Sequence, residues 1–199
     1  FSTIKRNYDT KEKVQNFLED LDRRVSNLHS IVKPDLVTWH NDENTVDYLN
    51  ALGKLSLGAM YPILLIGIEK FDKNEMKELI ILVTKLFFRS KTVCSTNYSD
   101  IERLVGNICE RLRSPEKTTV NNIREMMLKW EQYPDKEVFS TMFKRLQLPD
   151  AKAKYALSEI HYHMHGGRDT TLRVPINAQV EHIMPQTIRK TKWETETAY

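Results

Sequence analysis

The chain has 199 residues, of which 40% are hydrophobic and 29% are charged, and these proportions are ordinary for a soluble globular protein. This length suffices for one core, or for one domain and part of a second. The net charge of +3 permits a nucleic-acid partner but does not argue for one. The six Gly and seven Pro stand between long periodic stretches, which favours helices over a turn-rich β fold.

Two cysteines, Cys94 and Cys109, form no CxxC pair, which argues against a disulfide framework or a zinc finger. Reduced thiols in a cytoplasmic protein are the simple interpretation. The most apolar window runs from Leu55 to Ile68 and is shorter than the roughly 18 residues of a membrane helix, so it predicts a buried helix. The first residues do not read as a secretory signal. Because the chain begins at Phe1 rather than at Met and ends at Tyr199 within a polar run, we expect it to be a piece of a longer protein.

The first predicted helix spans residues 10 to 31, where apolar residues recur every three or four positions, and it ends near Lys33-Pro34. A second helix, capped by Asn44 or Thr45, is expected to run to about Lys70. Pro62 should kink or divide it, since proline removes a backbone donor.

Later helices are each expected to begin at a residue that favours a helix N-terminus. They run from Asp72 or Asn74 to Phe87, from Ser99 or Asp100 to before Ser114, from Thr118 or Thr119 to Trp130, from Asp135 to Leu146 and from Asp150 to His165. Gly166-Gly167 ends the last one. Beyond a boundary near residue 168, β-forming residues appear and 179–183 reads as a short strand. The sequence therefore predicts a mainly α fold, an irregular bundle of about seven helices in 1–168, with a short C-terminal β stub in 169–199.

The sharpest motif is Val180 to Gln186, Val-Glu-His-Ile-Met-Pro-Gln. An acidic residue and a His at a strand end, followed by Ile-x-Pro, are typical of the opening of an HNH-type nuclease site. Neighbouring strand residues point to opposite faces, so Glu181 can reach a divalent metal such as Mg²⁺ or Mn²⁺ while His182 faces a water. A neutral His182 can then take the water's proton as general base. The plainer alternative is a Glu-His pair satisfied by local hydrogen bonds.

This run resembles the Val-Asp-His-Ile-Val-Pro-Gln of HNH domains in CRISPR effector nucleases, with Glu181 in place of Asp. It is still more similar to the Glu-His-Ile-x-Pro-Gln signature of GmrSD-type modification-dependent restriction endonucleases. Tyr61-Pro62, Leu86 to Arg89 and Lys154 to Leu157 also resemble features of that family's helical region, in the right order along the chain.

The resemblance implies a helical region followed by the start of an HNH domain, in a DNA endonuclease of prokaryotic defence against foreign or modified DNA. It also implies a ParB-like NTPase domain before this chain, a cytoplasmic location and no membrane partner. The chain departs from the family pattern because no Asn follows Asn177 and no His follows His182. We therefore expect only weak metal binding and no cleavage by these 199 residues alone. The alternative is a helical interaction or regulatory module with a degenerate nuclease half.

Two further clusters have a functional and a plain interpretation. His161, His163 and His165 form an alternating run in which 161 and 165 share a helix face, but a helix-end cluster without ligand is favoured over a zinc site. A second possibility is that one of these His lines a cleft near Glu181. Four arginines are candidate DNA contacts, although interleaved glutamates favour a solvated surface. They are Arg103, Arg111, Arg113 and Arg124.

Overall fold

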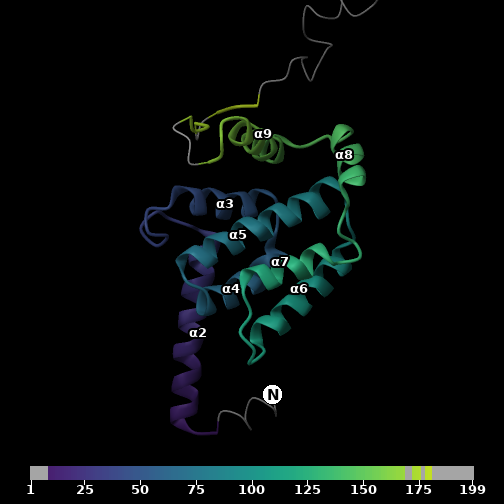
Figure 1. Cartoon of the computed structure of the whole chain (residues 1–199). Coiled ribbons are helices and arrows are strands. Elements are labelled where there is room, and N and C mark those ends of the chain that lie inside the picture. Colours follow the sequence, from purple (N-terminus) through teal and green to yellow (C-terminus); the bar gives the residue numbers. More distant parts are fainter. Residues whose placement is uncertain (1–8, 169–171, 176–177, 181–199) are drawn as a thin grey trace, which may run out of the picture. The chain divides into compact units, whose positions relative to one another are not determined.

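Figure 1 shows the computed structural model, which describes residues 9–168, 172–175 and 178–180. Over these residues the chain forms eight α-helices, a 3₁₀ turn and a π-helical segment, so the predicted mainly α fold is confirmed. The predicted β stub lies largely outside the described residues. None of the described helices has the length and apolarity that a membrane crossing requires.

The chain divides between Gln147 and Leu148 into two compact units. The first unit contains α2 (Lys11–Val32), α3 (Glu43–Lys54), η1 (Gly58–Met60), α4 (Tyr61–Lys70), α5 (Lys73–Phe87), η2 (Phe88–Val93), α6 (Tyr98–Arg113), α7 (Val120–Leu128) and α8 (Lys136–Lys144). The second unit contains α9 (Asp150–Met164) and the segment that follows it. The boundary near residue 168 concerns the start of a nuclease domain and stays a prediction.

Polar side chains begin several helices as the sequence indicates. Asp72 caps α5 in a reciprocal capping box with Glu75, and Thr119 does the same for α7 with Asn122. The predicted cap of α3 was wrong, because Asp42 rather than Asn44 or Thr45 begins that helix. Asp is among the best N-cap residues, and the Asp42 carboxylate accepts the backbone N–H groups of both residues that we expected to cap.

The predicted division of the second helix is confirmed. α3 ends at Lys54, and Ser56 adopts the left-handed region at φ 61° before the 3₁₀ turn η1. Pro62 then lies in the first turn of α4, where the missing N–H leaves no intrahelical bond unmade. The fourth predicted helix, α6, also starts earlier than expected, at Tyr98 with Asn97 before it.

Helices α4 and α5 form the centre of the first unit, with α6 packed on α4 and both α3 and α7 packed on α5 (Figure 1). A Cβ built on Gly67 of α4 would lie 2.6 Å from Cδ2 of Leu79 on α5, so the two helices meet too closely for a larger residue. The apolar side chains without solvent exposure come from all of these helices. They are Leu52, Ile63, Leu64, Leu79, Ile80, Val83, Ile108, Leu112 and Ile123.

Arg89, in the π-helical segment that continues α5, holds the short helix α8. Its Nε donates to the carbonyl of Pro134 at 2.8 Å, and its Nη2 donates to the carbonyl of Asp135 at 2.7 Å. The guanidinium also lies 4.6 Å from the ring centroid of Phe139. No residue of α8 is buried, so apolar packing holds this helix only weakly. The hydrogen bonds and the aromatic contact of Arg89 therefore help to keep α8 in place.

Candidate functional site

The two residues that carry the predicted chemistry, Glu181 and His182, lie outside the described residues. The described chain reaches Val180, the first residue of the motif. The second unit therefore provides the frame that leads into the motif, and this frame consists of α9 and the segment 172–175.

The chain reverses direction after α9 at two glycines. Gly166 and Gly167 have φ values of 84° and 113°, which residues with a side chain rarely adopt. The N–H of Gly167 donates to the carbonyl of Tyr162 at 2.7 Å, which closes the helix end. The predicted stop at Gly166-Gly167 is confirmed, and it turns the chain back along the helix that it has just left.

Tyr162 and Arg168 join the returning segment to α9. The Tyr162 hydroxyl accepts the backbone N–H of Val174 at 3.2 Å, while the Arg168 guanidinium lies 4.6 Å from the Tyr162 ring centroid. The Nε of Arg168 donates to Glu159 at 2.9 Å. Tyr162 is buried and the Arg168 side chain is only 11% exposed. This cluster was not predicted, because its one signal in the sequence is the spacing of Glu159 and Tyr162 on one helix face.

His161 of α9 belongs to the same frame. The Nε2 of His161 lies 2.8 Å from the carbonyl oxygen of Leu172, and because a carbonyl only accepts, this nitrogen carries the proton. His161 and His165 have ring centroids 4.5 Å apart. Within the part of the chain that the structure describes, no three His, Cys, Asp or Glu side chains come together as a metal site. Whether one of these His lines a cleft near Glu181 stays a prediction.

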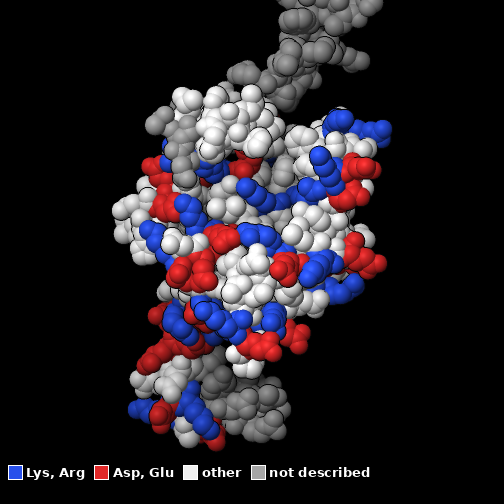
Figure 2. Space-filling view, in the orientation of Figure 1, with Lys and Arg blue, Asp and Glu red and all other residues white. Residues whose placement is uncertain are grey.

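The four candidate DNA-contact arginines lie on α6 and α7 of the first unit. Three of them have acidic partners: Arg103 lies 3.3 Å from Asp100, Arg111 pairs with Glu116, and Arg124 pairs with Glu78. Arg113 is exposed at the end of α6. Figure 2 shows basic and acidic side chains interspersed over the visible face, as on a solvated surface. DNA contact by these arginines stays a prediction.

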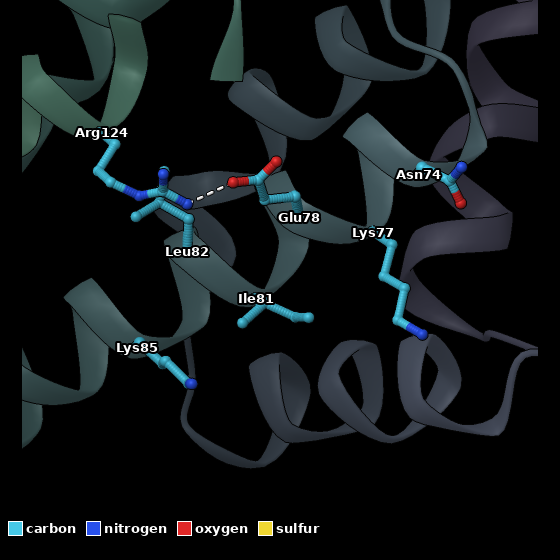
Figure 3. Close-up of a pocket in the computed structure, with 7 residues that line it drawn as sticks. All are labelled: Asn74, Lys77, Glu78, Ile81, Leu82, Lys85 and Arg124. Atoms are coloured by element: carbon cyan, nitrogen blue, oxygen red, sulfur yellow. Dashed lines mark hydrogen bonds and ion pairs between the residues drawn. The ribbon is translucent and has the colours of Figure 1, made fainter. Parts of the chain in front are cut away.

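An open hollow of about 360 Å³ lies along α5 beside Arg124 of α7 (Figure 3). Ile81 and Leu82 supply its apolar surface. Its charges are partly balanced, since Arg124 pairs with Glu78 and Lys77 Nζ lies 3.0 Å from Asp42 Oδ2. Neither His nor Cys occurs among the described residues that line it, so we assign no chemistry to this hollow.

Asp42, the partner of Lys77, is a structural carboxylate. Burial raises its pKa, but hydrogen bonds from Lys77 and from Thr45 outweigh that effect and hold the pKa below the ordinary value of 3.8. It stays ionised while it caps α3 and ties that helix to α5. The two cysteines are free, and burial raises the pKa of both thiols, so neither is activated as a nucleophile.

Comparisons with protein-family models, curated proteins and solved structures gave no match for this chain. The resemblance to GmrSD-type endonucleases therefore rests on the motifs in the sequence and stays a prediction. The fold, by contrast, rests on the structure itself.

Proposed function

We propose that this chain is part of a metal-dependent HNH-type DNA endonuclease, in which His182 is the general base and Glu181 is a metal ligand. The observation that carries the proposal is the seven-residue motif from Val180 to Gln186. The donor chemistry fits the group, because a carboxylate suits Mg²⁺ or Mn²⁺ and a neutral imidazole suits proton transfer. When bound, the metal supplies charge stabilisation at the scissile phosphate. Further ligands are needed to complete the site.

The remaining chemistry falls to the chain's own residues. His182 accepts the proton of the attacking water, which requires its imidazole to stay within hydrogen-bond reach of that water. The frame of α9 supports the proposal because Tyr162 and Arg168 hold the segment that precedes the motif. Anchoring the chain shortly before a catalytic motif restricts the positions that the catalytic side chains can adopt.

Cleavage of plasmid DNA by the full-length protein that contains this chain tests the assignment. His182→Ala removes the proton acceptor, and we expect the rate to fall by about 10²–10⁴-fold while DNA binding persists. His163→Ala is the matched control, because His163 is exposed on α9 and should leave the rate unchanged. His182→Ala that cuts at the parental rate with an unchanged melting temperature would show the nuclease assignment to be wrong, and the interaction module would take its place.

Glu181→Ala tests the metal side of the same proposal. Loss of one carboxylate ligand should weaken metal binding, so cleavage should fall and then partly recover as Mn²⁺ is raised. His182→Ala should show no such recovery, since its defect is in proton transfer. Equal dependence of both variants on Mn²⁺ would contradict this division of roles.

A further inference from the structure

Helix α2 carries apolar residues with the spacing of a coiled coil. Six of them follow one another at alternating steps of four and three residues, which places them at positions a and d of a seven-residue repeat. Leu18, Val25 and Val32 occupy a, and Val14, Leu21 and Leu28 occupy d. We refer to these six residues as the α2 seam.

The α2 seam faces away from the fold to which the helix belongs. All six side chains are between 37% and 56% exposed, and Ile31 is the one buried residue of the helix. Arg23 and Arg24 instead turn toward α4, with nitrogens 3.6 and 3.8 Å from Oε1 of Glu69. Figure 1 shows the N-terminal half of α2 extending past α3 and α4. A surface helix ordinarily buries its apolar side chains against its own core and exposes its charged ones. In α2 the side chains of the seam are exposed and two arginines turn toward α4.

The exposed apolar area of the α2 seam is large enough to form an interface. The α2 seam exposes on the order of 500 Å², which is near the top of the range for the largest apolar patch of a monomer, roughly 300–600 Å². Two such faces, when each covers the other completely, remove about 1,000 Å² before any flanking residue is counted, which is the lower limit for a specific interface.

We propose that the chain forms a parallel dimer in which the α2 seam of one copy packs against the α2 seam of a second copy. Val25 and Val32 at a, with Leu21 and Leu28 at d, match the side-chain shapes that favour two parallel helices. The first layer has the two residue types exchanged, with Leu18 at a and Val14 at d. An antiparallel arrangement of the same layers sets Asp22 against Asp22, a like-charge contact that the parallel arrangement avoids. The proposal does not depend on nuclease activity.

Sedimentation of the 199-residue chain tests the assembly state. We expect a dimer, and we expect Leu21→Glu to convert it to a monomer. The helical signal in circular dichroism should fall by no more than unfolding of α2 alone would cause. Leu128→Glu is the matched control, because Leu128 is an exposed helical leucine outside α2, and this variant should remain dimeric. A monomeric parent chain overturns the proposal and assigns the cover of the α2 seam to another segment or partner.

Cross-linking tests the orientation and does not rely on a destabilising variant. Val25→Cys places a thiol at an a position, which meets its own counterpart only in the parallel arrangement, so mild oxidation should give a covalent dimer. The parent chain, with Cys94 half-buried and Cys109 buried, is the control and should give none. A cross-link that forms only when Leu21→Cys and Val25→Cys chains are mixed indicates antiparallel helices and overturns the proposal.

Discussion

The Asp42 carboxylate joins two helices at one point. Its oxygens accept the N–H groups of Asn44 and Thr45 at the start of α3, and they also receive Lys77 from α5. The capping bonds need only an acceptor, whereas the contact with Lys77 gains from the negative charge. Substitutions can separate these two contributions.

We predict that Asp42→Ala lowers the free energy of unfolding by about 1–2 kcal/mol at neutral pH, which is the cost of an N-cap. Asp42→Asn should cost less, because Asn is also a good cap and the change removes only the charge facing Lys77. Urea denaturation of both variants measures the difference. Equal losses would indicate that the cap contributes nothing here.

The pH dependence of stability gives a second test of Asp42. Its pKa is lowered in the folded chain, so its stabilising effect is present above the ordinary value of 3.8 and is lost as pH falls through the lowered value. We therefore expect the stability gap between the parent chain and Asp42→Asn to shrink as pH falls below about 4. A gap that stays constant down to pH 2 would contradict the ionic contribution.

At the scale of elements, two helical glycines should respond in opposite ways to alanine. In Gly67→Ala the new Cβ would meet buried Leu79 at the junction of α4 and α5, and overpacking of this kind costs about 1–3 kcal/mol. Gly106→Ala in α6 meets nothing within 4 Å, so the gain in helix propensity, about 1 kcal/mol, should raise stability. Melting temperatures of the two variants decide the matter, and a stabilised Gly67→Ala would show that Leu79 can move aside.

The contact between η2 and α8 depends on the shape of a guanidinium. Lysine at position 89 keeps the charge but cannot reach both carbonyls in fixed geometry while lying over Phe139. We predict faster amide hydrogen exchange across Lys136–Lys144 in Arg89→Lys, with α6 unchanged as the internal reference. Exchange that is unaltered in α8 would mean that other contacts hold this helix.

Local signals were enough to predict most helix positions, because caps and apolar spacing are properties of neighbouring residues. Asp72, Thr119 and the Gly166-Gly167 stop illustrate this. The partners of Arg89 and Arg168 were not predictable, since they depend on how distant segments pack. The orientation of α2 was missed for a related reason: periodicity shows that a helix has an apolar face but not what that face contacts. For the motif, the sequence supplied the chemistry of Glu181 and His182, and its geometry stays a prediction.

At the scale of the whole molecule, the division between Gln147 and Leu148 predicts where a protease cuts first. Arg145 is exposed in the connection between α8 and α9, which has no regular structure from residue 146 to 149. Brief trypsin treatment should cleave after Arg145 before it cleaves within α6, and the fragment 1–145 should keep the melting temperature of the first unit. Mass spectrometry identifies the first cut. Initial cleavage inside Tyr98–Arg113 would contradict the two-unit division.

The exposure of the α2 seam also has a consequence for how the sequence changes by mutation. Single-base changes readily convert a valine codon to one for alanine, aspartate or glutamate, and such changes in the α2 seam remove little from the packing of the first unit. Random substitution would therefore replace these apolar residues sooner than buried residues such as Leu79, whose loss would destabilise the first unit. If the α2 seam served no purpose outside the monomer, six regularly spaced apolar residues would be among the first features of the sequence to disappear.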